Sequence, residues 1–153
     1  MGRATAILFA SEGAKVAVTD LNQESCDAVV AEIRTNGGTA NAYALDVSNN
    51  DAIKSVVAKV ASDFGGIDIL VNNAGISAFC PLDAGDEYDA IWDRALAILL
   101  TAHQRTVRAA LPWLRKATQP GKGYSMTDSA SAVVPRRPLT LREVSVCVTA
   151  WGS

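Results

Sequence analysis

Side chains that can bind a polar ligand follow three of the apolar runs in this sequence. Asp20 and Asp46 each come directly after such a run, and Asn72 and Asn73 come after a third. Short apolar runs bounded by turn residues are typical of strands buried on both faces of a parallel sheet. Because open α/β sheets bind ligands at the carboxyl ends of their strands, these carboxylates and amides are predicted to line a ligand-binding edge.

The spacing between Gly2 and Asp20 predicts which kind of ligand this edge would bind. Gly2 opens a predicted helix, and Asp20 lies 18 residues later, close to the roughly 20 residues between a phosphate-binding turn and the acid that binds the adenosine ribose. A carboxylate at this position accepts hydrogen bonds from the ribose hydroxyls and repels a 2′-phosphate, so it favours NAD over NADP. The alternative interpretation is a turn aspartate that caps the next helix.

A resemblance to a known family centres on residues 67–75, which read Ile-Asp-Ile-Leu-Val-Asn-Asn-Ala-Gly. This strand and its Asn-Asn-Ala-Gly ending resemble the signature of the short-chain dehydrogenase/reductase family. Upstream, a predicted helix, the segment Glu-Gly-Ala-Lys-Val at residues 12–16 and then Asp20 are similar to the start of the same family. The resemblance covers about residues 2–117. It implies NAD(P)-dependent oxidation of an alcohol or reduction of a ketone on a small-molecule substrate.

The resemblance also assigns cofactor contacts to individual residues. Asp46 and Val47 match the adenine-contacting pair of the family, although a polar residue that ends a strand explains Asp46 equally well. The three residues that follow Asn72 match the segment that passes beneath the cofactor. Asn72 itself is interpreted as structural, with its amide tying neighbouring strands together. The predicted cofactor-binding residues are Gly2, Asp20, Asp46, Val47, Asn73, Ala74 and Gly75. No metal site is predicted.

The proton-transfer residues of the family have no counterpart in this sequence. The family uses a tyrosine acid with a nearby lysine, a serine that holds the substrate oxygen, and an asparagine on a long helix that organises a proton relay. Leu99 stands at the asparagine position, and Ala130 stands at the serine position, where Ser129 or Ser131 could substitute only after a one-residue shift. Residues 125–153 contain neither tyrosine nor lysine. We therefore predict no catalytic residue.

Two further parts of the family pattern are missing. Gly2 corresponds only to the last glycine of the phosphate-binding turn, and the strand before that turn, central in the order 3-2-1-4-5-6, has no counterpart upstream of it. Its two neighbours are therefore expected to expose their edges. From about residue 120 the family pattern stops, and Pro135 and Pro138 interrupt the tail. A truncated start and a reading-frame change near residues 117–123 explain both departures; this hypothesis fails if neither alternative frame encodes Tyr-x-x-x-Lys.

The elements that position these residues alternate between helix and strand. The alternation predicts an α/β fold, a partial Rossmann-like, doubly wound parallel sheet with helices on both faces. We divide the chain into an incomplete NAD(P)-binding domain, residues 1–119, and a divergent tail, residues 120–153. Predicted strands cover residues 15–19, 40–45 and 69–71; predicted helices cover residues 3–11, 23–34, a segment after Ser48, and residues 86–117.

Local signals mark where these helices begin and end. Gly13 is placed to stop the first helix, and Asn22 to cap the second. Ser48 and Asp51 have the spacing of a capping box for the third. Pro112 is expected to kink the long helix or to start a new turn.

Composition excludes several classes of protein. The 153 residues are 49% hydrophobic, enough for one domain with a real core, and their net charge of −2 argues against partners such as nucleic acid or an anionic membrane. No run is apolar enough to span a bilayer, and the start resembles no signal peptide. Cys26, Cys80 and Cys147 predict neither disulfides nor a metal cluster, which favours a cytoplasmic location. His103 is interpreted as a surface or packing residue.

The sequence therefore favours a fragment of a short-chain dehydrogenase/reductase that is inactive alone. An active but unusual dehydrogenase is a second hypothesis. A third is a non-enzymatic partner of a full-length relative, because in this family the long helix commonly contributes to a four-helix oligomer interface. That hypothesis implies a homo- or hetero-oligomer formed through residues 86–117.

Overall fold

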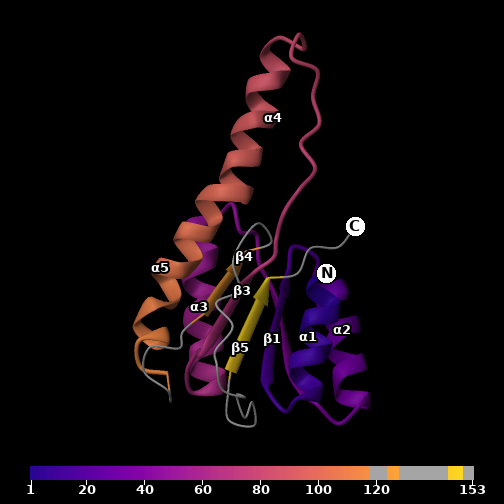
Figure 1. Cartoon of the computed structure of the whole chain (residues 1–153), viewed down its shortest axis with the longest axis vertical. Helices are drawn as coiled ribbons and strands as arrows, with labels where there is room; N and C mark the ends of the chain where they lie inside the picture. The colour runs from indigo at the N-terminus through magenta and orange to yellow at the C-terminus, as the bar shows by residue number, and fades with distance from the viewer. Residues whose placement is uncertain (118–123, 128–144, 150–153) are drawn as a thin grey trace.

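The computed structural model describes residues 1–117, 124–127 and 145–149, and in this part of the chain parallel strands form one sheet (Figure 1). Its strand order is β2-β1-β5-β3-β4. The α/β class with a parallel sheet is therefore confirmed. The elements are α1 (Gly2–Ser11), β1 (Lys15–Asp20), α2 (Gln23–Thr35), β2 (Thr39–Ala44), α3 (Asn50–Phe64), β3 (Ile69–Asn72), α4 (Asp86–Leu96), η1 (Ala97–Thr101), α5 (Ala102–Leu114), β4 (Tyr124–Thr127) and β5 (Ser145–Thr149).

Consecutive side chains of the strands belong to two different cores. In β1, Val16 and Val18 pack with α1 and α2, while Ala17 belongs to the core that α3 and α5 cover. In β3, Val71 lies in the first core and Leu70 in the second. This alternation follows from the two-residue period of a strand, and it requires helices on both faces of the sheet. The run at residues 69–71 is thus a strand buried on both faces, as predicted, and β1 is buried in the same way, whereas the edge strand β2 is only partly buried.

Two of the helix-boundary predictions are confirmed and one is wrong. Gly13, with φ 92°, follows the end of α1, and the Asn22 side chain accepts a hydrogen bond from the Glu24 amide at the start of α2. At the start of α3, however, the cap is Asn49, whose side chain accepts from the amides of Asp51 and Ala52. The hydroxyl of Ser48 instead donates to Asp46 at 2.7 Å.

The expectation that two strands would expose their edges is wrong. Strand β5 lies between β1 and β3 and is parallel to both, with Lys15 opposite Ser145, and Asn72 opposite Thr149. A segment near the end of the chain therefore occupies the central position of the sheet. The sequence Ser-Val-Cys-Val-Thr contains the β-branched run that could have indicated this strand.

The long helix predicted over residues 86–117 is divided into three parts. A π-helical turn, η1, lies between α4 and α5, and α5 continues through Pro112 to Leu114. The irregular turn is therefore at η1, where no residue pattern predicted one, and not at Pro112. Figure 1 shows α4 extending well beyond the sheet.

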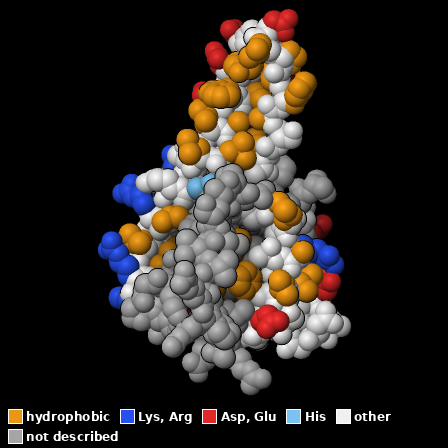
Figure 2. Space-filling view, in the orientation of Figure 1, with side chains coloured by type: hydrophobic (Ala, Val, Ile, Leu, Met, Phe, Trp, Pro, Cys, Tyr) orange, Lys and Arg blue, Asp and Glu red, His pale blue; other side chains and the backbone are white. Residues whose placement is uncertain are grey.

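Large apolar side chains remain exposed on this extension. Trp92 is 52% exposed and Leu100 is 64% exposed, and Figure 2 shows hydrophobic side chains over the extended α4 region with acidic side chains at its tip. The exposed large hydrophobic residues on and before these helices are Phe79, Leu82, Trp92, Leu96, Leu99 and Leu100. None of the helices in the described ranges is both long enough and apolar enough to cross a membrane.

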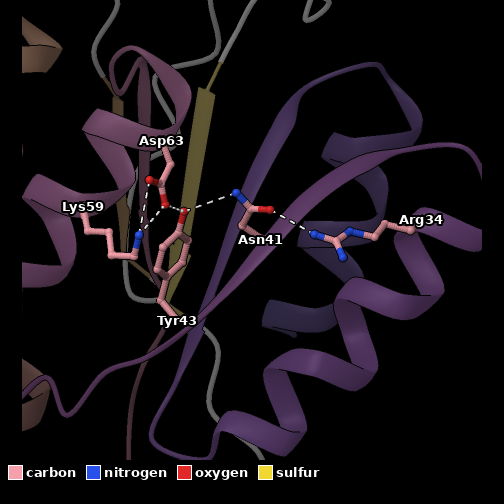
Figure 3. Close-up of polar contacts among 5 residues, drawn as sticks. All are labelled: Arg34, Asn41, Tyr43, Lys59 and Asp63. Atoms are coloured by element: carbon pink, nitrogen blue, oxygen red, sulfur yellow. Dashed lines mark hydrogen bonds and ion pairs between the residues drawn. The ribbon is translucent and has the colours of Figure 1, made fainter.

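A polar network at the edge strand β2 joins helices from both faces of the sheet (Figure 3). The Tyr43 hydroxyl donates to Asp63 at 2.8 Å, and Lys59 forms an ion pair with Asp63 at 3.1 Å. On the other side Arg34 donates to Asn41, whose amide donates to the Tyr43 oxygen. The network thus ties β2 to α2 and to α3.

Candidate functional site at the carboxyl edge of the sheet

The carboxyl ends of the strands meet at one edge, and the connectivity reverses there. From β1 the chain passes outward to β2 and then returns across the sheet to β3, on the other side of β5. Doubly wound sheets bind ligands at such a switch point. Asp20 and Asn72 are the last residues of β1 and β3, so they lie at this edge. The Leu45 amide donates to the Asp20 carbonyl at 2.7 Å, which also brings the β2–α3 loop here.

Asp20 is 7% exposed, and its carboxylate organises the turn that follows β1. Its Oδ1 accepts a hydrogen bond from the Asn22 amide at 3.0 Å. Asn22 in turn caps α2 by accepting from Glu24 at 2.8 Å. The alternative interpretation of Asp20 therefore describes part of its local role, but the helix cap itself is Asn22. A buried carboxylate at this edge can accept further hydrogen bonds from ligand hydroxyls.

Asp46 and Val47 differ in their exposure to solvent. Asp46 is exposed, and its Oδ1 accepts from the amide of Ser48 at 2.8 Å and from its hydroxyl at 2.7 Å. Val47 is buried in the core beneath α3 and α5. Asp46 thus shapes the loop that follows β2, but it does not end the strand, because β2 ends at Ala44. Its ligand role stays a prediction.

Asn72 fastens the end of β3 to α5. It is 2% exposed, and its Oδ1 accepts a hydrogen bond from the Thr106 hydroxyl at 2.7 Å. Thr106 is itself buried, and its hydroxyl also lies 3.0 Å from the Ala102 carbonyl. This contact agrees with a structural role for Asn72, but it joins β3 to helix α5, and the predicted tie between neighbouring strands stays a prediction.

The segment after Asn72 runs close to the long helix. A Cβ atom added to Gly75 would lie 3.3 Å from Cδ2 of Leu99, so even an alanine would require a small adjustment there. Ala74 is buried beside it, and Asn73 is half-buried. Leu99, which stands at the family's asparagine position, therefore presents a methyl group to this segment and no amide.

The first turn of α1 also lies at this edge, as the N-terminal label in Figure 1 shows. Gly2 is buried as the first residue of α1, which packs against β5. The first turn carries no acidic residue, and Met1 makes no side-chain cap. A helix N-terminus with uncapped amides attracts anions such as a phosphate group.

Among the described residues, the further candidate reactive groups are a cysteine, a histidine and possible metal ligands. Burial, reinforced by the nearby Asp20 carboxylate, raises the pKa of the Cys26 thiol to about 11, which keeps it protonated and a poor nucleophile. His103 is half-buried, and its Nε2 has no hydrogen-bond partner within the described ranges. No group of three or more potential metal ligands occurs there. Ala130, Ser129 and Ser131 lie outside the described residues.

Comparisons with known proteins agree with this arrangement. A family model described as short chain dehydrogenase matches residues 1–123. The chain is 38% identical over 116 residues to the 3-oxoacyl-[acyl-carrier-protein] reductase FabG of Thermotoga maritima, covering 76% of the chain and 46% of that protein. It is 40% identical over 151 residues to the 2,5-dichloro-2,5-cyclohexadiene-1,4-diol dehydrogenase LinX of Sphingobium indicum, covering 97% and 56%.

Solved structures of short-chain dehydrogenases are also similar to this chain. A metagenomic short-chain oxidoreductase in complex with NADP is 33% identical with a TM-score of 0.74, over 90% of this chain and 60% of that one. A hydroxysteroid dehydrogenase from Escherichia coli is 32% identical with a TM-score of 0.70, over 75% and 48%. The chain spans about half the length of the curated relatives it matches.

Proposed function

The chain belongs to the short-chain dehydrogenase family, and on that premise we propose that it is the cofactor-binding portion of an oxidoreductase. The activity of the whole protein would be NAD(P)-dependent oxidation of an alcohol or reduction of a ketone on a small molecule. The observation that carries this proposal is the buried Asp20 carboxylate at the end of β1. It shares the switch-point edge with the first turn of α1 and the segment after Asn72.

We propose NAD as the preferred cofactor, bound by Gly2, Asp20, Asp46, Val47, Asn73, Ala74 and Gly75. The amides at the start of α1 would hold the pyrophosphate, and Asp20 would accept hydrogen bonds from the ribose hydroxyls. A 2′-phosphate next to the Asp20 carboxylate would be repelled, although one structural relative is in complex with NADP. When bound, the nicotinamide supplies hydride chemistry, and the protein positions it.

Calorimetric titration with NAD and NADP tests the cofactor site. We expect saturable NAD binding and weaker NADP binding. Asp20→Asn keeps an acceptor for the Asn22 amide but removes the charge, so it should weaken NAD binding roughly tenfold and reduce the discrimination against NADP. Asp27→Asn, an exposed carboxylate on α2, is the matched control. Absence of NAD binding by a folded chain would sink the proposal.

We propose further that the chain is a fragment without dehydrogenase activity of its own. Leu99 cannot organise a proton relay, and residues 125–153 supply no tyrosine acid and no lysine. Incubation with NAD and a panel of secondary alcohols should therefore yield no NADH signal above the uncatalysed rate. Measurable turnover that disappears in Asp20→Asn would favour the active, unusual dehydrogenase instead.

A second candidate function is a partner for a full-length relative, and the exposed apolar surface of α4 and η1 favours it. Trp92, Leu99 and Leu100 are all exposed on the extension, and contiguous exposed apolar surface commonly marks an interaction site. Size-exclusion chromatography of a mixture with an intact relative should show co-elution. Leu100→Glu should abolish it, whereas Leu8→Glu, an equally exposed leucine on α1, should not.

We also propose a cytoplasmic location. Cys26 and Cys80 are free thiols, and Cys26 is buried. Free cysteines are typical of a reducing compartment. Fractionation of cells that express the full chain tests this proposal: we expect the protein in the cytoplasmic fraction with both thiols open to alkylation after denaturation. Recovery in another fraction would contradict it.

A further inference from the structure

A cavity of about 360 Å³ lies between the first turns of α3 and the first half of α5, and cations line it. Its lining residues are Asn50, Lys54, Arg105, Arg108 and Ala109. Three of the five carry a positive charge and none is acidic. Figure 2 shows Lys and Arg side chains on the α5 side of the molecule, well separated from the acidic tip of α4.

The positive charges of this cavity are only weakly compensated by the protein. Lys54 forms an ion pair with Asp51 at 3.0 Å, but both side chains are well exposed, so water and salt screen this pair. Arg105 donates to the Ser48 carbonyl at 3.2 Å, which is a neutral partner. Arg108 is exposed and makes no hydrogen bond or ion pair with the residues that the structure describes. The cavity therefore keeps a net positive potential.

The arrangement is also partly preorganised for an anion. Arg105 is half-buried, and its bond to Ser48 restrains the guanidinium group. Arg105 and Arg108 are three residues apart on α5, which places them on the same face of the helix. Asn50 is the first residue of α3, so the positive end of that helix dipole adds to the charge of the cations.

We propose that this cavity binds a small molecule that carries a phosphate group. Two guanidinium groups and one ammonium group match a dianionic phosphate, and arginine binds phosphate with two parallel hydrogen bonds. The volume lies near the lower end of the range of small-molecule sites. The net charge of −2 argues against a nucleic acid as the ligand. The cavity shares no lining residue with the predicted cofactor site, although Asn50 and Ser48, whose carbonyl accepts from Arg105, follow Asp46 and Val47 closely in the chain. The proposal does not depend on NAD binding.

Calorimetric titration of the full chain with inorganic phosphate and, separately, with glycerol 3-phosphate tests this proposal, with sodium chloride at matched ionic strength in the reference. We expect saturable binding of at least one of these probes. Arg108→Gln should weaken it about tenfold or more, because the positive charge and its charge-assisted hydrogen bonds to the phosphate are lost. Tighter binding of glycerol 3-phosphate would identify a phosphate ester as the ligand type, and tighter binding of inorganic phosphate would identify the free ion.

Arg115→Gln is the matched control, because it removes the same charge from an exposed position next to the end of α5 and outside the cavity. It should leave the affinity unchanged. Equal losses in Arg108→Gln and Arg115→Gln would overturn the proposal in favour of a general surface-charge effect. Absence of saturable binding by wild-type protein with an intact cooperative thermal transition would overturn it as well.

Discussion

At the scale of single residues, a hydrogen bond between distant positions changes how Asp63, on α3 beside β2, ionises. The hydrogen bond from Tyr43, supported by Lys59, holds the pKa of the Asp63 carboxyl below its usual range. A carboxylate with a lowered pKa in the folded state stabilises the fold above its unfolded-state pKa, near 4. That contribution is lost as the pH falls through the folded-state pKa.

Tyr43→Phe removes the larger of the two influences on Asp63. We expect the pKa of Asp63 to rise toward the usual range, and the stability advantage of the wild type at neutral pH to shrink as the pH falls below about 4. Carbon-detected NMR titration of the Asp63 carboxyl measures the pKa, and urea unfolding as a function of pH measures the stability. Tyr88→Phe, on α4, is the control. An unchanged pKa of Asp63 in Tyr43→Phe would contradict the prediction.

Thr106→Val tests the contact that joins β3 to α5. Valine keeps the shape of the side chain but removes the hydroxyl that donates to Asn72 at 2.7 Å. Because both residues are buried, we expect the free energy of unfolding to fall by about 1–3 kcal/mol. Thr35→Val, at an exposed position on α2, should change it by no more than about 0.5 kcal/mol. Equal effects in urea unfolding would show that the buried bond contributes little.

At the scale of elements, competition between neighbouring polar residues decides where a helix begins. Ser48, Asn49 and Asn50 all carry side chains that can cap a helix. The Ser48 hydroxyl is already bonded to Asp46, so Asn49 satisfies the first amides of α3. The start of α3 therefore depends on the loop that precedes it.

Replacing Asn49 should lower the free energy of unfolding more than replacing Ser48 does. Asn49→Ala removes a side chain that accepts from two amides, so we expect a loss of about 1–2 kcal/mol. Ser48→Ala removes only the exposed bond to Asp46 and should cost less than about half as much. Urea denaturation of both variants measures the difference. A larger loss in Ser48→Ala than in Asn49→Ala would indicate that Ser48 is the cap of α3.

At the scale of the whole molecule, β5 makes the sheet continuous. It is bonded to β1 on one side and to β3 on the other, while β2 and β4 form the edges of the described sheet. Without β5, the two halves of the sheet would share no strand-to-strand hydrogen bonds. The central position of a segment from near the end of the chain means that residues far apart in sequence must meet before the sheet is complete, which favours slow folding.

Proline substitutions at adjacent positions test the central position of β5. Adjacent residues of a strand direct their amides to opposite sides, so both Val146→Pro and Cys147→Pro remove a hydrogen bond inside the sheet. Each should lower the free energy of unfolding by roughly 2 kcal/mol or more, because the abandoned carbonyl stays buried.

The edge strand β4 provides the matched comparison. It pairs only with β3, so one of Ser125→Pro and Met126→Pro should be much better tolerated than the other. Urea unfolding measures the free energy of unfolding of all four proline variants: large losses are expected in both β5 variants and in only one of the two β4 variants. If one of the two β5 variants is also well tolerated, β5 is not bonded on both sides.

The sequence by itself determined the local elements, the α/β class and the edge at which polar residues gather. These follow from patterns with a short range: a two-residue period in buried strands, capping side chains such as Asn22, and a positive-φ glycine such as Gly13. Because parallel strands place their carboxyl ends together, the sequence also placed Asp20 and Asn72 at a common edge.

Only the tertiary structure decided which segments become neighbours. The insertion of β5 between β1 and β3, the hydrogen bond from Thr106 to Asn72, and the cationic cavity shared by α3 and α5 each join residues far apart in the chain. No periodicity within a short window encodes such pairings, since they depend on how the helices cross the sheet and on which strand fills its centre. The family resemblance predicted that the central strand of the sheet would be missing. In the structure residues 145–149 form a strand at that position.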